Sequence, residues 1–229
     1  MVSFIIPVHN QSDILIKNMD RLKAGIRLKD YEIIIAEDGS TDGFDKIVPK
    51  LKKQGIRVLS YKEKLGRGKA LENALRESKS DIIFYMDADL ATDLSEIEKI
   101  LEMIDKGYDI VTGSRLLKGS RVVGRSFLRT FFSRSYNLLL RFLFNSKIHD
   151  HQCGFKAFRK KTVLPLLDEV DDSHWFWDSE LLVKAQKKGL RVAEVPVRWV
   201  EKGNSRVRLS TDIIYMGLAA IRLRLFKWN

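Results

Sequence analysis

The chain has 229 residues and a formal net charge of +11 at pH 7, with 45% hydrophobic and 31% charged residues. This length fits one α/β domain or at most two small ones. No run approaches the roughly 18 apolar residues that a bilayer-spanning segment needs, and the single cysteine excludes an internal disulfide framework and is typical of a reducing compartment. The large positive charge favours an anionic partner, such as nucleic acid, anionic lipid or a phosphorylated substrate.

The first half of the chain alternates between short β-branched runs and helical patterns. Strands are predicted at residues 2–8, 31–36, 56–60, 81–86 and 108–112. Helices are predicted between them, at residues 14–23, 44–54, 69–78 and 95–106. The last of these helices begins with Ser95 and Glu98, which match a capping box. Alternation at this spacing predicts a Rossmann-like, mainly parallel sheet flanked by helices.

The second half is less regular and contains a long basic segment. A helix is predicted from about residue 125 to 144, strands at 154–158 and 191–199, and helices at 179–188 and 211–226. Residues 110–149 include eight lysines and arginines but no aspartate or glutamate. Since a solvated surface usually mixes both signs of charge, we interpret this segment as functional.

Two acidic clusters follow predicted strands, Glu37 and Asp38 after the second strand and Asp87 and Asp89 after the fourth. Ligands of open parallel sheets bind beyond the carboxyl ends of the strands. Asp87 and Asp89 point the same way if the strand pleat continues through them. Two adjacent carboxylates repel unless a cation joins them, and a hard divalent ion bound by carboxylates and substrate phosphates satisfies this need. A loop that caps a helix is the alternative interpretation.

Several motifs, taken in order, resemble those of the inverting family 2 glycosyltransferases, whose fold is called GT-A. These motifs are Pro7-Val8-His9-Asn10, residues 37–42, Gly66-Arg67-Gly68-Lys69, Asp87-Ala88-Asp89 and Gly113-Ser114-Arg115. Residues 150–156, with the sequence DHQCGFK, resemble the signature of the polyprenyl-phosphate sugar synthases, including dolichyl-phosphate mannose and glucose synthases. Residues 87–92 and 176–181 look closer to the glucosyltransferase branch, and the resemblance covers nearly the whole chain.

This resemblance implies metal-dependent, inverting transfer of a hexose from a nucleotide diphosphate sugar to dolichyl or polyprenyl phosphate. UDP-glucose is the favoured donor and GDP-mannose the next, with Mg²⁺ or Mn²⁺ as the cofactor. Within a single catalytic domain, residues 1–115 would bind the nucleotide sugar and residues 116–229 the acceptor. Two departures stand out, because Gln11 replaces the usual glutamate of the first motif and Ala91 replaces a glutamine common in mannose synthases.

The site residues follow from the same resemblance. The pocket for the nucleotide sugar would contain Pro7, Asn10, Glu37, Asp38, Lys69 and Asp87. The metal ligands would be Asp87 and Asp89, and the leaving diphosphate would be stabilised by Asp89, through the metal, and by Arg206. The acceptor and its phosphate would be bound by Arg115, Arg129, Ser133, Asp150 and Gln152.

Two helical patterns favour binding at a membrane surface. In the helix predicted at 125–144, a polar stripe lies opposite an apolar arc that is rich in phenylalanine; the stripe consists of Arg125, Arg129, Ser133, Asn137 and Arg141. A basic amphipathic helix with aromatic residues is typical of interfacial binding, whereas the alternative is a helix whose apolar arc packs on the sheet. The final helix ends among arginines, Lys227 and Trp228, which also suits an interface. We therefore expect a peripheral protein on the anionic, cytoplasmic face of a membrane.

The class of acceptor determines whether a general base is needed. An acceptor phosphate is already ionised near pH 7, whereas a hydroxyl needs a base, for which Asp178 is the candidate. Asp178 could alternatively cap the helix predicted at 179–188. Two rival interpretations remain: a glycosyltransferase of the same fold acting on a glycan or glycolipid hydroxyl, and a non-enzymatic nucleic-acid-binding protein. The acidic clusters argue against the second, so no nucleic-acid partner is expected.

Overall fold

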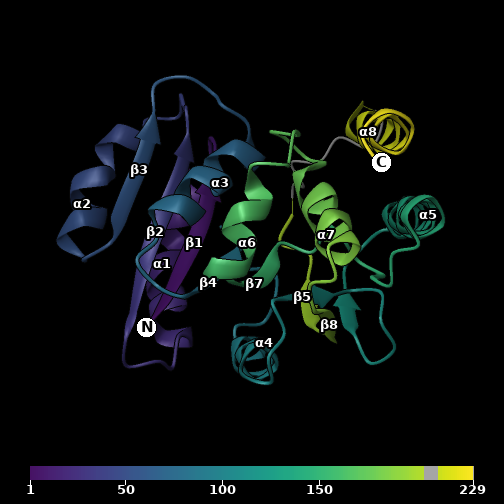
Figure 1. Ribbon diagram of the computed structural model, residues 1–229. Helices are drawn as coiled ribbons and strands as arrows, with labels where there is room; N and C mark the ends of the chain where they lie inside the picture. The colour runs from purple at the N-terminus through teal and green to yellow at the C-terminus, as the bar shows by residue number, and fades with distance from the viewer. Residues whose placement is uncertain (204–210, 229) are drawn as a thin grey trace.

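Seven strands form the central sheet of the computed structural model, which describes residues 1–203 and 211–228 (Figure 1). The strand order is β3-β2-β1-β4-β7-β5-β8. All neighbouring strands pair in parallel except β7, which is antiparallel to both β4 and β5. The mainly parallel α/β architecture predicted from the sequence is therefore confirmed. The strands are β1 Val2–Val8, β2 Tyr31–Asp38, β3 Arg57–Tyr61, β4 Ile82–Met86, β5 Ile110–Ser114, β7 Phe155–Arg159 and β8 Val192–Pro196.

Helices cover both faces of this sheet (Figure 1). In β1, Phe4 and Ile6 belong to one core cluster and Ile5 to the other, as the two-residue period of a strand requires. The first cluster also includes apolar side chains of α1, α2 and α4, and the second those of α3, α6 and α7. The bounds are α1 Ser12–Gly25, α2 Val48–Lys53, α3 Arg67–Glu77, α4 Glu96–Asp105, α6 Lys160–Leu167 and α7 Trp177–Lys187.

Two predicted elements are corrected by the structure. The helix expected at 44–54 is a 3₁₀ turn, η1 Phe44–Lys46, followed by α2, whose first turn contains a proline. The strand expected at 191–199 is two strands, and the first of them, β8, ends at Pro196. The second piece, β9 Arg198–Val200, pairs instead with β6 Arg121–Val123 in a small parallel sheet.

The capping box expected at the start of α4 does not form. The Ser95 side chain accepts no hydrogen bond from the helix amides. Its hydroxyl accepts instead from Arg198 at 2.6 Å, while the Ser95 amide donates to Asp93 Oδ1 at 3.0 Å. Asp93 therefore orders the turn before the helix, and the hydroxyl of Ser95 is used to attach the chain around β9.

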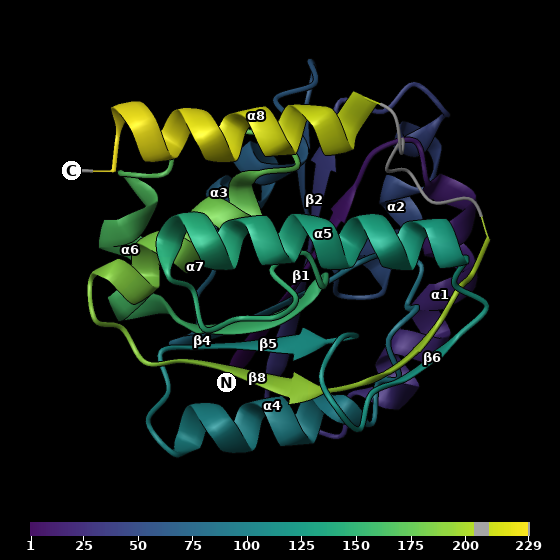
Figure 2. The same ribbon diagram turned by 90° about the vertical axis from the view of Figure 1, so that its right-hand side faces the viewer.

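Two long helices, α5 Phe127–Phe144 and α8 Thr211–Phe226, lie side by side at one side of the molecule (Figure 2). Buried side chains from both helices and from α7 form a third apolar cluster between them. Arg129, Ser133 and Asn137 of the polar stripe face inward, where Asn137 Oδ1 accepts hydrogen bonds from the amide and ring of His151, whereas Arg141 is exposed. Of the phenylalanines of α5, Phe127, Phe131 and Phe142 are exposed, the first and last at 82% and 84%, whereas Phe144 is buried. The alternative in which the apolar arc packs on the sheet is therefore wrong.

In the part of the chain that the structure describes, every helix is too short or too polar to cross a bilayer.

Candidate active site

A cleft of about 630 Å³ opens at the carboxyl ends of β1, β2, β4 and β5, where ligands of open parallel sheets bind. Side chains of α5, α7 and α8 complete its lining. Of the residues predicted from the sequence, those that line it are Pro7, Asn10, Asp38, Asp87, Asp89, Arg115, Arg129, Ser133, Gln152 and Asp178. Glu37, Lys69 and Asp150 are not among the lining residues, and Arg206 lies outside the described residues.

A tight turn directly after β4 presents the two aspartates. The amide of Leu90 donates to the carbonyl oxygen of Asp87 at 3.1 Å, so the strand pleat does not continue as expected. Asp89 Oδ1 accepts a hydrogen bond from the amide of Ala91 at 3.0 Å. Burial, and next the negative charge of Asp87, raise the pKa of Asp89 to about 6. The turn therefore holds two carboxylates close enough to repel each other.

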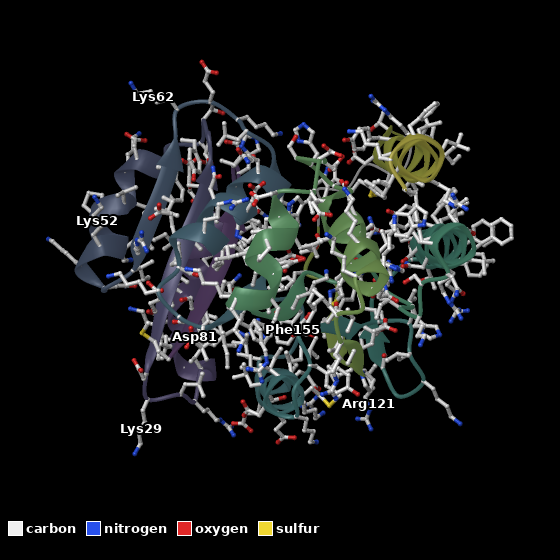
Figure 3. All side chains as sticks on the ribbon, viewed as in Figure 1. Lys29, Lys52, Lys62, Asp81, Arg121 and Phe155 are labelled. Atoms are coloured by element: carbon white, nitrogen blue, oxygen red, sulfur yellow. The ribbon has the colours of Figure 1, made fainter. Side chains whose placement is uncertain are left out.

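Gly154 makes room for the carboxylate of Asp87. Because β7 is antiparallel to β4, the amide of Asp87 can donate to the carbonyl of Gly154, at 3.1 Å. A Cβ atom at Gly154 would lie 2.0 Å from Asp87 Oδ2. Phe155, the next residue, begins β7 and is buried in the interior (Figure 3). The DHQCGFK segment thus lies against the acidic turn and requires glycine where the two meet.

The acidic turn fits a divalent cation whose remaining ligands come from a substrate. The raised pKa of Asp89 indicates that the negative charge of this carboxylate is not fully compensated. Among the described residues there is no group of three histidine, cysteine or acidic side chains suited to a metal ion. A hard ion such as Mg²⁺ commonly binds to one or two carboxylates together with substrate phosphates. Asp87 and Asp89 are therefore the residues that could hold such an ion.

An alternating chain of charges lies beside the acidic turn. Arg67 contacts Asp87 Oδ1 at 2.7 Å and Asp178 Oδ2 at 2.9 Å. The fully buried Lys156 contacts Asp178 Oδ1 at 2.9 Å, and Tyr85 donates its hydroxyl to the same carboxylate. Burial raises the pKa of Asp178, but the charges of Lys156 and Arg67 outweigh it and lower that pKa below its ordinary value. Asp178 is thus an ionised, fully paired carboxylate, which is poorly suited to be a general base.

The residues at the ends of β1 and β2 line the cleft and also form hydrogen bonds to neighbouring loops. Asp38 Oδ1 accepts hydrogen bonds from the amides of Leu65 and Gly66, at 2.6 and 3.1 Å. Gly66 has φ of +103°, which favours glycine, and a Cβ there would lie 2.3 Å from a backbone oxygen. Asn10 Oδ1 accepts from the amide of Thr41 at 2.7 Å. Asp38 therefore fixes the loop from which Arg67 projects.

Two of the other predicted residues act outside the cleft. Glu37 is buried and accepts hydrogen bonds from the Ser40 amide and the Ser60 hydroxyl. The ammonium of Lys69 contacts Glu72 at 2.9 Å on the same helix. Glu37 thus holds the loop after β2, and Arg67, not Lys69, is the cation of the Gly66–Lys69 motif that reaches the cleft.

Arginines dominate the opposite side of the cleft. Two parallel hydrogen bonds, Nε to Oδ2 at 2.7 Å and Nη2 to Oδ1 at 2.8 Å, join Arg115 to the fully buried Asp150. Arg129 forms an ion pair with Glu201, just after β9. The buried Ser133 hydroxyl has no hydrogen-bond partner among the described residues. This side of the cleft therefore combines fixed cations with a hydroxyl that has free hydrogen-bonding capacity.

A family model described as "Glycosyl transferase family 2" matches residues 3–164 of the chain. The chain belongs to glycosyl transferase family 2. It is 40% identical over 228 residues to the glycosyltransferase AglD of Haloferax volcanii, an alignment that covers 96% of this chain but 36% of that protein. It is 32% identical over 240 residues to the dolichyl-phosphate beta-glucosyltransferase ALG5C of Trichomonas vaginalis, covering 98% of this chain and 71% of that protein.

Solved structures confirm the GT-A fold of this family 2 member. One is the glucosyl-3-phosphoglycerate synthase of Mycobacterium tuberculosis, crystallised with Mn²⁺, UDP and glucosyl-3-phosphoglycerate. It superimposes with a TM-score of 0.73 at 17% sequence identity, covering 98% of this chain and 79% of that one. At this identity the likeness establishes the fold alone.

Sequence reasoning on this family 2 chain missed Arg67 and Lys156 as residues of the site. Both stood inside motifs that the sequence analysis singled out, so the signal was present. Arg67 can be chosen over Lys69 only when the direction of each side chain at the first turn of α3 is known. Lys156 is fully buried, and no local sequence pattern predicts the burial of a single lysine. Trp199, which also lines the cleft, was predicted only as part of a strand.

Proposed function

We propose that this chain transfers a hexose, with glucose favoured over mannose, from a nucleotide diphosphate sugar to dolichyl or polyprenyl phosphate at a membrane surface. The observation that supports this most directly is one cleft with carboxylates suited to a cation on one side and arginines on the other. Such a cleft accommodates two phosphorylated molecules, because the first side recruits a metal-bound diphosphate and the second an anion. Within a single catalytic domain, residues 1–115 would form the donor side and residues 116–229 the acceptor side.

The donor side is assigned from the lining of the cleft. Pro7, Asn10 and Asp38 are assigned to the base and ribose of the nucleotide. UDP is favoured because a solved structure of the same fold was crystallised with UDP and Mn²⁺. Asp87 and Asp89 would hold Mg²⁺ or Mn²⁺, which when bound neutralises charge on the departing diphosphate. Arg206 remains a prediction for that same charge, outside the described residues.

Transfer would proceed as a single displacement with inversion. An oxygen of the acceptor phosphate attacks the anomeric carbon, and the bond from that carbon to the diphosphate oxygen breaks, releasing the nucleoside diphosphate. The acceptor is already ionised, so no proton has to be removed from it. The paired state of Asp178 agrees with this scheme and disfavours transfer to a hydroxyl. We assign Asp178 to the positioning of Arg67.

The outward side of α5 and α8 supports attachment to a membrane. Their exposed apolar side chains, here called the α5–α8 surface, are Phe127, Leu128, Phe131, Leu138, Phe142, Ile214, Tyr215, Leu218, Ile221, Leu225 and Phe226. Exposed arginines, among them Arg134, Arg141, Arg222 and Arg224, project from the same two helices. A large apolar surface with basic residues is typical of binding to anionic lipid. We propose that this surface lies on the cytoplasmic face of a membrane.

The double variant Phe142→Ser/Phe226→Ser should sediment far less with anionic liposomes than the native protein. Each phenylalanine loses its burial in the lipid, roughly 3 kcal/mol for the two, or about a hundredfold in partitioning. Val123→Ser, which removes an exposed apolar side chain of β6 outside the α5–α8 surface, should sediment normally. Equal sedimentation of the double variant and the native protein would show that this surface does not bind the bilayer.

The function itself is tested by transfer of labelled sugar to short-chain dolichyl phosphate from UDP-glucose and, separately, from GDP-mannose. We expect transfer from UDP-glucose with Mg²⁺ or Mn²⁺, and at least a hundredfold loss with EDTA, since charge on the leaving group would lose its stabilisation. Metal-dependent transfer from GDP-mannose alone would show that the transferred sugar is mannose and not glucose. No transfer from either donor would refute the proposed acceptor.

A further inference from the structure

Arg125 is the residue just before the N-cap of α5, and its guanidinium lines the cleft beside Arg115 and Arg129. Its Nε atom is buried and has no hydrogen-bond partner within residues 1–203 and 211–228. Buried polar groups are nearly always hydrogen-bonded in native proteins, so such an atom calls for an explanation. A ligand that accepts a hydrogen bond at this position would supply one.

The neighbouring arginines differ from Arg125 because each has a carboxylate partner. Arg115 is bound through two hydrogen bonds to Asp150, and Arg129 is paired with Glu201. In the described ranges no carboxylate lies within ion-pair distance of Arg125. Burial, and next the positive charge of Arg115, lower the pKa of Arg125 to about 10, so it stays a cation at neutral pH. The one uncompensated guanidinium of the three is therefore Arg125.

The aromatic ring of Trp199 lies close to the Arg125 guanidinium. The ring centroid of Trp199 lies 6.0 Å from the guanidinium carbon of Arg125 and 5.8 Å from that of Arg115. Such stacking favours a planar cation and leaves its edge free for hydrogen bonds. This contact involves the face of the guanidinium and leaves its N–H groups available.

The surroundings of Arg125 point to an amphiphilic anion. Two and three residues further along the chain, Phe127 and Leu128 are 82% and 59% exposed on the α5–α8 surface. Within the cleft, the buried hydroxyl of Ser133 also lacks a partner among the described residues. A phosphate attached to an apolar chain would meet unsatisfied donors in the cleft and an apolar surface beside it.

We propose that Arg125 directly binds the phosphate of the lipid-linked acceptor. The inference rests on the proposed function and names the residue that recognises its acceptor. Charge-assisted bonds from a guanidinium to phosphate oxygens are among the strongest hydrogen bonds in proteins. Arg115 and Arg129 lie on the same side of the cleft, and each is already paired with a carboxylate.

Arg125→Gln and Arg125→Lys test the proposal, with Arg121→Gln as the matched control. Arg121 is exposed on β6 and lies outside the cleft (Figure 3). In Arg125→Gln the KM for farnesyl phosphate should rise about 10- to 100-fold, because a charged hydrogen bond is lost. The dissociation constant of UDP with Mn²⁺ should change less than about twofold. Arg125→Lys should recover part of the acceptor affinity, and Arg121→Gln should match the native protein.

Direct titration of farnesyl phosphate and of inorganic phosphate by calorimetry separates this inference from the proposed function. If the native protein binds farnesyl phosphate but transfers no sugar to it, the proposed function fails, and weaker binding by Arg125→Gln still supports the role of Arg125. Equal binding by native and Arg125→Gln proteins overturns that role, as does weakened UDP binding with an unchanged KM for farnesyl phosphate. Inorganic phosphate bound as tightly as farnesyl phosphate would contradict recognition of an amphiphile. Equal melting temperatures would confirm that all variants fold.

Discussion

Asp89→Asn should lower kcat for sugar transfer at least about a hundredfold, the usual effect of removing one group that stabilises charge in a transition state. The turn after β4 offers two carboxylates to a cation, and the substitution leaves one. Affinity for Mn²⁺ in the presence of UDP should fall as well, which electron paramagnetic resonance or calorimetry can measure without turnover. The loss would then be assigned to metal binding and not to folding.

Asp93→Asn is the appropriate control, because Asp93 follows the same strand but is absent from the lining of the cleft. Its ion pair with Arg198, at 3.3 Å, lies at the surface, and asparagine keeps an Oδ1 acceptor for the Ser95 amide, so the substitution should change stability only slightly. Native Mn²⁺ affinity in Asp89→Asn would refute the assignment of this residue as a metal ligand.

Asp178→Asn should destabilise the folded protein by roughly 3–5 kcal/mol, because it leaves the buried charge of Lys156 without its counterion. For a chain of this size the melting temperature should fall on the order of 10 °C. The pKa of Asp178 lies below the unfolded value of about 3.9. Its contribution is therefore complete at neutral pH and is lost as the pH falls through the folded-state pKa.

A double-mutant cycle isolates this pair. Lys156→Met should also destabilise the protein, since Asp178 then loses one of its two cations. In Lys156→Met/Asp178→Asn no buried ammonium remains, so the double variant should be more stable than the sum of the single changes predicts, by about 1 kcal/mol or more. Additive effects in urea unfolding would show that Lys156 and Asp178 do not depend on each other. Activity lost in Asp178→Asn must be read beside this measurement, because instability would imitate the loss of a base.

The elements with the clearest periodicity were predicted most accurately from the sequence. Residues 2–8 and 211–226 have the predicted bounds, because a continuous apolar run and a long helical pattern are both local signals. The placement of β7 between β4 and β5 depends on pairing between distant segments, which no local pattern specifies. For the same reason the contact between Gly154 and Asp87 was not anticipated, although both motifs had been singled out.

The orientation of α5 shows a limit of amphipathic patterns. The sequence divides the helix into a polar stripe and an apolar arc, but the arc can pack against protein or face lipid with equal periodicity. In the structure, polar side chains of the stripe bind other parts of the protein: Asn137 is hydrogen-bonded to His151, and Arg129 forms an ion pair with Glu201. Membrane binding was predicted from a basic amphipathic pattern with aromatic residues, and the exposure of Phe127 and Phe142 now supports it.

The antiparallel strand β7 also makes the two halves of the chain depend on each other. β4 and β5 belong to residues 1–115, yet they do not pair with each other, because β7 occupies the space between them. In a fragment that ends at residue 115, the backbone N–H and C=O groups of β4 and β5 that pair with β7 would be unpaired. Such exposed strand edges promote aggregation, because they can pair with another chain. The sheet can close only after residue 159 has left the ribosome. We therefore expect that residues 1–115 do not fold as a module separate from residues 116–229.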